Sequence, residues 1–138
     1  MNITRYLKCN RGQTKVQTAI VLPVLVLILF SLLEFGQVMN QYLILTAAAR
    51  EGARLAAVSN DTAARAAVNG AVASIGNNDL LVNIGYSNGK REQGMLVTVT
   101  VCKPITVITP IFKDIINQAF TPDPLTLKGQ SVMRVEVP

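Results

Sequence analysis

Among the side chains that most often serve as metal ligands or as catalytic acids and bases, this chain has eight carboxylates and two thiols, and it contains no histidine. Cys9 and Cys102 lie far apart, so they form neither a metal-ligand cluster nor a cysteine–histidine nucleophile. The carboxylates are scattered, and no pattern pairs two of them: Glu34, Glu51, Asp61, Asp79, Glu92, Asp114, Asp123 and Glu136. We therefore predict no enzymatic activity, no catalytic residues, no metal site and no cofactor.

Charged residues at helical spacing occur at Arg50, Glu51 and Arg54. Residues three apart on a helix are neighbours, so Glu51 and Arg54 can pair within one helix. Arg50 or Arg54 can instead pair with Glu34 of a neighbouring subunit in a helix bundle. Glu34 can also lie at the edge of a membrane anchor, where its carboxylate reaches the lipid headgroups. These interpretations require a long helix on both sides of Glu34.

The hydrophobic residues that would form such a helix are concentrated in one segment. Within residues 19–33, only Pro23 and Ser31 interrupt a run of aliphatic residues and one phenylalanine. A helix of about 17 to 25 apolar residues crosses the hydrocarbon core of a bilayer, whereas a soluble helix would show a polar stripe. We expect a transmembrane segment at residues 16–36, in contact with membrane lipid. Pro23 is either a harmless bend or a local loosening that helps the helix leave the bilayer.

The charges beside this segment predict its orientation. Residues 1–15 carry four basic side chains and no acid, and the next base is Arg50. The positive-inside rule places such a flank in the cytoplasm. No small-residue cleavage site of the secretory type follows directly, so we expect the segment to be retained. Residues 1–15 are thus a basic cytoplasmic leader, and the carboxyl-terminal part lies outside the cytoplasm in a single-pass cell-membrane protein. Basic and aromatic residues do not interleave, so we expect no nucleic-acid partner.

We expect residues 37–58 to extend the same helix. Small and apolar residues recur there at three- and four-residue intervals, which is one face of an amphipathic helix. This face consists of Phe35, Val38, Met39, Tyr42, Leu45, Thr46, Ala49, Ala53, Ala56 and Ala57. The alanines and Gly52 favour close approach of another backbone, belonging either to a neighbouring subunit or to a sheet of the same chain.

Residues 59–138 are expected to form an extracytoplasmic head. Asn60 or Asp61 can cap a second helix that stops at Gly76. Alternating patterns then predict strands in "LLVNIGY" and "MLVTVTVCK", joined by the turn "SNGKREQG", and a last strand in "LTLKGQSVMRVEV". A further short helix is expected after Pro110, in "PIFKDIINQAF".

The fold class is therefore α+β: a long amino-terminal transmembrane and amphipathic helix, then a small head with a three-stranded antiparallel sheet and short helices on one side. The strand order stays open. In the second strand, alternation puts an apolar set on one face (Met95, Val97, Val99 and Val101) and a mixed set on the other (Leu96, Thr98, Thr100 and Cys102). Cys102 either forms an intermolecular disulfide or is a buried small hydrophobic residue.

Two stretches of the sequence carry a resemblance to a known family. "RGQTKVQTAIVLPVLVLILFSLLEFGQ", followed by "YLILTAAAREGARLAA", resembles the opening of the TadE-like family, the pseudopilins of the tight adherence (Tad) pilus, a branch of type IV pili. The most specific part is "AREGAR" after the "EFG" at the end of the span, whereas the terminal "VMRVEV" is less distinctive. The resemblance implies an envelope protein that helps to assemble or regulate a secreted filament, with other pilin or pseudopilin subunits as partners.

The resemblance also implies a processing site. Pilins are cut by a prepilin peptidase after a glycine, and the fifth residue of the mature chain is a glutamate. The matching positions here are Gly12, Gln13 and Gln17, so the glycine is present and glutamine replaces the glutamate. In pilins this glutamate neutralises the terminal amine of a neighbouring subunit, and such an ion pair is stronger in a low dielectric than at a protein surface. Gln17 offers only a neutral hydrogen bond.

Together these features predict a non-enzymatic minor pilin or pseudopilin that acts through its amino-terminal helix, in the membrane and in an oligomeric assembly or surface pilus. An alternative is a membrane-tethered binding module that is unrelated to a filament. In that case the head captures a ligand and the helix serves only as a tether.

Overall fold

The structure is a computed structural model that describes the backbone of residues 10–105 and 125–136, with side chains from residue 15 onward. The helix expected after Pro110 lies outside these residues. Contacts within the chain separate two units, residues 1–35 and 36–138. One helix, α1 (Asn10–Val58), has its first part in one unit and its remainder in the other.

The first unit contains α1 up to residue 35 and the predicted transmembrane segment. The helix is uninterrupted through Pro23. A proline inside a helix leaves one carbonyl without its usual amide donor, and membrane helices tolerate this because neighbouring groups adjust. Ser31 lies further along, and its hydroxyl donates to the carbonyl oxygen of Leu27 at 2.8 Å, so this polar group is satisfied within the helix.

The second unit begins with the carboxyl-terminal part of α1 and continues with α2 (Asp61–Val72) and the short 3₁₀ turn η2 (Ala73–Ile75). Asn60 is the N-cap of α2, and its side-chain oxygen accepts a hydrogen bond from the amide of Ala63 at 2.7 Å. Gly76 ends the helical segment with a φ of 79°, a conformation that glycine adopts without a steric penalty. The predicted start and stop of this helix are confirmed.

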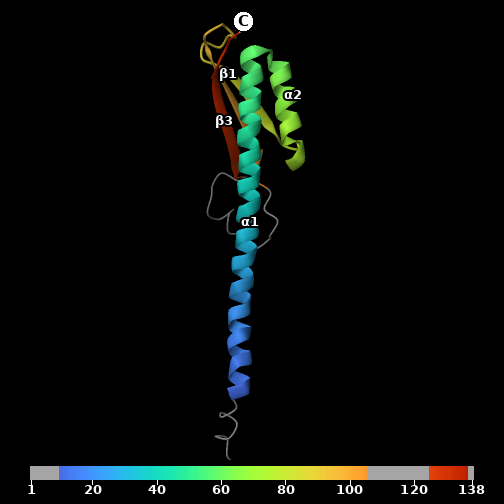
Figure 1. Ribbon diagram of the computed structural model, residues 1–138, viewed down its shortest axis with the longest axis vertical. Coiled ribbons are helices and arrows are strands. Elements are labelled where there is room, and N and C mark those ends of the chain that lie inside the picture. The colour runs from blue at the N-terminus through green and yellow to red at the C-terminus, as the bar shows by residue number, and fades with distance from the viewer. Residues whose placement is uncertain (1–9, 106–124, 137–138) are drawn as a thin grey trace, which may run out of the picture. The chain divides into compact units, whose positions relative to one another are not determined.

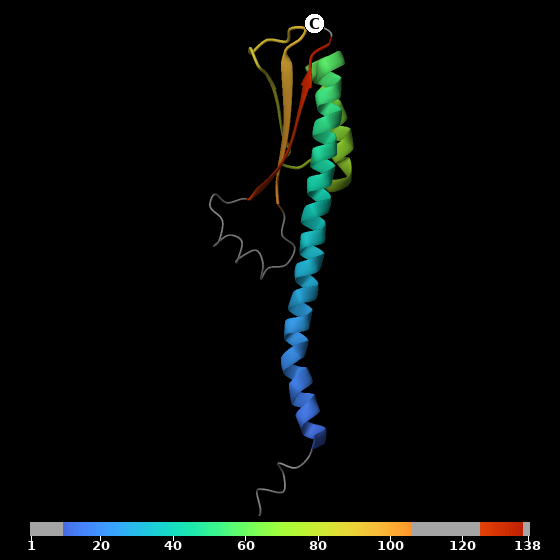
Figure 2. The same cartoon turned by 60° about the vertical axis from the view of Figure 1, so that its left-hand side comes forward.

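Three strands form one antiparallel sheet: β1 (Leu81–Tyr86), β2 (Leu96–Pro104) and β3 (Thr126–Arg134). Their order is β1-β2-β3, so consecutive strands are neighbours and β2 is central. The sequence left this order open. Figure 1 shows α2 beside the carboxyl-terminal part of α1, and Figure 2 shows the sheet as a separate layer next to them. The α+β class with a three-stranded antiparallel sheet is confirmed.

The core of the head lies between the helices and the valine face of β2. Val97, Val99 and Val101 are fully buried, as their alternation predicts. The helices contribute mainly small residues, so their backbones come close to the sheet and to each other. The helical residues of this core are Leu45, Ala48, Ala49, Ala53, Ala56 and Ala57 of α1 and Ala64, Val68 and Val72 of α2.

The predicted apolar face of α1 is covered only in its carboxyl-terminal part. Leu45 and the alanines at positions 49, 53, 56 and 57 are buried, whereas Phe35, Met39 and Tyr42 on the same face are exposed. The helical period continues through these residues, whereas Leu45 is the first of the α1 residues in the core of the head. Periodicity identifies a face of a helix, but it does not show how much of that face another element covers.

Two glycines permit the closest approaches in the head. A Cβ atom on Gly129 of β3 would lie 2.5 Å from the carbonyl oxygen of Leu45, so any side chain there would collide with the backbone of α1. A Cβ atom on Gly52 of α1 would lie 2.5 Å from Cγ2 of Val68 and 3.3 Å from Cγ1 of Val99. These glycines therefore set the spacing between α1 and β3 and between α1 and α2.

Backbone hydrogen bonds near the carboxyl terminus join the last strand to the helices and the β1–β2 loop. The amide of Glu136 donates to the carbonyl of Ala57, at the end of α1, at 3.0 Å. The amide of Val135 donates to Met95, and its carbonyl accepts from Gly94, both at 2.8 Å. The residues after β3 are therefore hydrogen-bonded both to the end of α1 and to the loop between β1 and β2.

Candidate functional site

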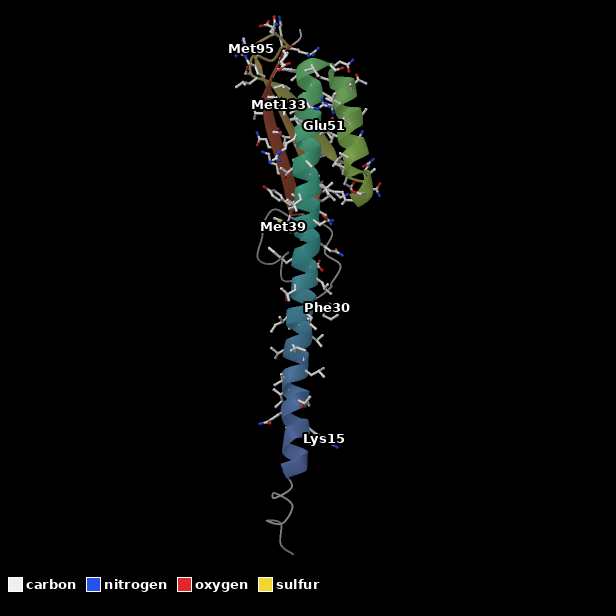
Figure 3. All side chains as sticks on the ribbon, viewed as in Figure 1. Lys15, Phe30, Met39, Glu51, Met95 and Met133 are labelled. Atoms are coloured by element: carbon white, nitrogen blue, oxygen red, sulfur yellow. The ribbon has the colours of Figure 1, made fainter. Side chains whose placement is uncertain are left out.

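The most extensive chemical feature in the described residues is the uncovered apolar surface of α1 between residues 16 and 33. Most of the large side chains there are at least half exposed, for example Ile20 at 69%, Leu29 at 53% and Leu33 at 67%. Figure 3 shows these side chains projecting from the helix, with Lys15 and Phe30 labelled. Soluble proteins rarely expose a contiguous apolar patch of this extent. The helix is long and apolar enough to cross a membrane.

The candidate peptidase site lies at the start of α1. Gly12 and Gln13 are in the first turn, and the helix begins at Asn10. Gln17 is one turn further, and its side chain is exposed. The positions of Gly12, Gln13 and Gln17 do not show whether the chain is cleaved there, so cleavage stays a prediction.

Glu51 and Arg54 form the pair that can be made within one helix. Arg54 Nη2 lies 2.6 Å from Glu51 Oε1, and Arg54 Nε donates to Glu51 Oε2 at 3.1 Å. This hydrogen bond lowers the pKa of Glu51 and raises that of Arg54. Both side chains are about half exposed, so the pair adds little to stability. Arg50 is exposed on the same helix, and Glu34 is partly covered near the end of the first unit.

Gly52 packs inside the chain. Its nearest neighbours from other elements are Val68 of α2 and Val99 of β2. Of the two partners that the sequence allowed for the small-residue stretch, the structure contains the helix and sheet of the same chain.

Tyr86 and Asp61 join the end of β1 to the start of α2, because the phenol of Tyr86 donates a hydrogen bond to Oδ1 of Asp61. The pKa of Tyr86 is raised to about 12, first because burial disfavours the phenolate and then because Asp61 accepts its hydrogen bond and repels a second negative charge. In the sequence, Asp61 is only a possible helix cap or an isolated acid. The contact depends on residues 25 positions apart.

Lys103 is a buried cation that the sequence analysis did not single out. Its side chain is 6% exposed, and Nζ donates to the carbonyl oxygen of Ile75 at 2.9 Å and to that of Gly76. These carbonyls are at the end of η2, where helical carbonyls have no amide partners and a cation is favourable. The signal was present in the sequence, because alternation from Val97, Val99 and Val101 places position 103 on the inward face.

Cys102 lies on the opposite face of β2, where its thiol is free and partly exposed. It is therefore not fully buried. Within the residues that the structure describes, no three histidine, cysteine, aspartate or glutamate side chains gather as a metal site would require. A shallow hollow near the β1–β2 loop contains Arg134 and Gln93, whose side chains donate to the carbonyls of Gly94 and Glu136.

The comparison with protein families gives a match to the family described as TadE-like protein, at residues 12–54. Residues 12–54 are similar to this family. The comparisons with curated proteins and with solved structures found no match. The resemblance identified from the sequence is thus confirmed for this segment, which contains the exposed apolar surface, the Glu51–Arg54 pair and Gly52.

Proteins of the TadE-like family are associated with the Tad pilus, a system in which subunits assemble with other pilus components. The TadE-like family is not known as enzymatic. One apolar amino-terminal helix is compatible with a single-pass membrane protein in such a system.

Proposed function

We propose that this chain is a non-enzymatic minor pilin or pseudopilin that takes part in the assembly of a Tad-type type IV pilus. The observation that carries the proposal is the coincidence of the TadE-like segment with the exposed apolar surface of α1. Exposure of this apolar surface to water is unfavourable, so other apolar groups must contact it in the cell. Lipid can provide these groups in the membrane, and apolar helices of other subunits can provide them in a filament.

The head gives the helix a folded domain that does not depend on the apolar surface. Its core is made of residues from Leu45 onward, whereas the apolar surface ends before this position. The helix can therefore exchange lipid for protein neighbours without unfolding the head. Glu34 and Arg50 are the residues that could form an ion pair with the helix of a neighbouring subunit. Pro23 is the position at which the helix could loosen when it leaves the bilayer.

The orientation follows from the charges. The basic leader at residues 1–15 stays in the cytoplasm, and the head lies outside it. A prepilin peptidase would cut between Gly12 and Gln13. Intact-mass measurement on the native protein tests this step, because a chain that begins at Met1 in cells containing the peptidase would exclude cleavage.

The test of the function is deletion of the gene in its native host, with complementation by the full chain. We expect loss of surface pili on deletion, and co-purification of the tagged protein with other pilus subunits. Fibres that persist unchanged, together with a protein that purifies without pilus subunits, would contradict the proposal. That outcome would favour the alternative of a membrane-tethered binding module.

A matched pair of variants tests whether the apolar surface of α1 is needed for membrane retention and for piliation. Leu29→Lys places a charge in the middle of the apolar surface and leaves the core of the head untouched. We expect this variant to lose membrane retention and piliation, whereas Val132→Lys, an exposed position on β3, should retain both.

A further inference from the structure

The exposed side chains change in kind along α1. Up to position 33 they are almost all apolar. Between positions 37 and 43, exposed Gln37 and Asn40 mix with apolar Met39, Tyr42 and Leu43, which are 46%, 45% and 59% exposed. Beyond this stretch the exposed large side chains begin with charged residues at positions 50 and 54. The order is therefore apolar, mixed and charged.

The three kinds of exposed side chain follow one another as the layers of a bilayer do, and the lengths of helix that they occupy are similar to the thicknesses of those layers. Residues 16–36 of a helix fill a hydrocarbon core of about 30 Å, at 1.5 Å per residue. The headgroup layer adds roughly 5 to 8 Å on each side, and exposed apolar side chains continue about 10 Å past position 36. Helical side chains tilt toward the amino terminus, so Tyr42 and Leu43 reach back toward the preceding turn.

We propose that residues 37–43 of α1 lie in the headgroup layer of the outer leaflet, with Met39, Tyr42 and Leu43 in contact with lipid. The inference rests on the membrane insertion in the proposed function. Tyrosine suits this layer because its ring is apolar and its hydroxyl is polar. The headgroup layer also accepts the amides of Gln37 and Asn40, which the hydrocarbon core would not.

Lipid fits this patch better than a second copy of the chain. By themselves, Met39, Tyr42 and Leu43 are three side chains, too few for a stable protein interface, to which each partner contributes roughly 20 residues; the cover of this patch therefore follows from that of the adjoining span, which is lipid while the protein is in the membrane. Their surface is continuous along one helix with that of the predicted span. In addition, Leu45, two residues later, is already fully buried in the head.

The test uses the absence of tryptophan from the sequence. Three single-tryptophan variants of the full chain, Tyr42→Trp, Leu27→Trp and Val132→Trp, are placed in vesicles of phosphatidylcholine and phosphatidylglycerol. The vesicles contain a nitroxide quencher either on the headgroup or in the middle of the acyl chain. We expect Tyr42→Trp to be quenched roughly two-fold more by the headgroup label than by the acyl-chain label, because the layers differ in depth.

The two other variants are the controls. Leu27→Trp should be quenched more by the acyl-chain label, and Val132→Trp, on β3 in the head, should be quenched by neither. If Leu27→Trp is quenched but Tyr42→Trp is not, the inference is overturned while the membrane anchor stands. If neither is quenched, the membrane insertion in the proposed function fails as well.

A second copy of the chain would give a different result at the same position. The emission of Tyr42→Trp would then shift only as the protein-to-lipid ratio rises, and the headgroup label would not quench it. This outcome would overturn the assignment to lipid. Quenching that is independent of the protein-to-lipid ratio supports the proposal.

Discussion

Tyr86 and Asp61 show how a single contact joins two elements of the head. The hydrogen bond links the end of β1 to the first residue of α2. It replaces water at both groups, and such a bond contributes about 1 kcal/mol to folding. Tyr86→Phe should therefore lower the free energy of unfolding at pH 7 by roughly this amount, as measured by chemical denaturation of the full chain in detergent.

The same tyrosine predicts a dependence on alkaline pH. Its pKa is raised in the folded state to about 12, above the ordinary value of 10, so the neutral phenol is favoured by folding. The resulting stabilisation is complete below pH 10 and is lost as the pH rises from 10 to 12. Because Tyr86 is only partly buried, the loss should not exceed about 2 kcal/mol.

Denaturation between pH 9 and 12 measures this loss, and Tyr86→Phe should remove it. Asp61→Asn supplies a control, because it removes the negative charge that opposes ionisation of Tyr86. We expect a smaller alkaline loss for this variant. A Tyr86→Phe curve that falls as steeply as that of the unmodified chain would contradict the assignment.

Lys103 is the second residue whose contacts predict that its substitution lowers the stability of the head. Its ammonium group donates to the carbonyls of Ile75 and Gly76 at the end of η2. Lys103→Met keeps most of the side-chain length and removes both hydrogen bonds, so we expect a loss of about 1 to 3 kcal/mol. Lys128→Met is the matched control, since Lys128 is exposed on the adjacent strand and should change stability by less than about 0.5 kcal/mol. Equal effects of the two substitutions would show that the carbonyl contacts do not matter.

At the scale of elements, glycines decide how closely α1 packs. Gly52→Ala adds a methyl group that would lie 2.5 Å from Val68, which is fully buried and cannot move without disturbing the core. Overpacking of this kind costs about 1 to 3 kcal/mol. Gly70→Ala is the matched control on α2, because its added Cβ meets nothing within 4 Å.

The two alanine variants are expected to have opposite signs. Gly70→Ala should stabilise the head by up to about 1 kcal/mol, because alanine loses less conformational freedom in a helix than glycine does. Thermal unfolding of the full chain, followed by circular dichroism, measures both variants. A stabilising Gly52→Ala would mean that α1 and α2 are not packed as closely as described.

At the scale of the whole molecule, the two cysteines report on orientation. Cys9 lies in the basic leader and Cys102 in the head, where its thiol is partly exposed. A membrane-impermeant maleimide added to intact cells with a permeable outer envelope should label Cys102 only. Cys9 should react only after the cytoplasmic membrane is opened, and not at all if the leader has been cleaved.

The variants Cys9→Ser and Cys102→Ser assign the signals. With Cys102→Ser, labelling of intact cells should disappear. Strong labelling of this variant before the membrane is opened would place the leader outside and would reverse the predicted orientation.

Periodicity predicted the elements of the head better than it predicted their contacts. The change from a three- to four-residue period to alternation placed α2, the strands and the valine face of β2 correctly, because side-chain direction follows from backbone geometry alone. The same reasoning put Phe35, Met39 and Tyr42 on the same face of α1 as Leu45 and the buried alanines, but only Leu45 and the alanines are covered by the head. A period gives the direction of a side chain and contains no information about what lies opposite.

The sequence by itself determined the long apolar helix, the TadE-like segment, the cap at Asn60 and the stop at Gly76, because each depends on residue types at short separation. Only the tertiary structure decided the strand order, the burial of Lys103, the Tyr86–Asp61 bond and the position at which the head begins to cover α1. Each of these depends on atoms that are distant along the chain and close in space. Many pairings of such residues satisfy the local pattern equally well, and only packing of the whole head selects one of them.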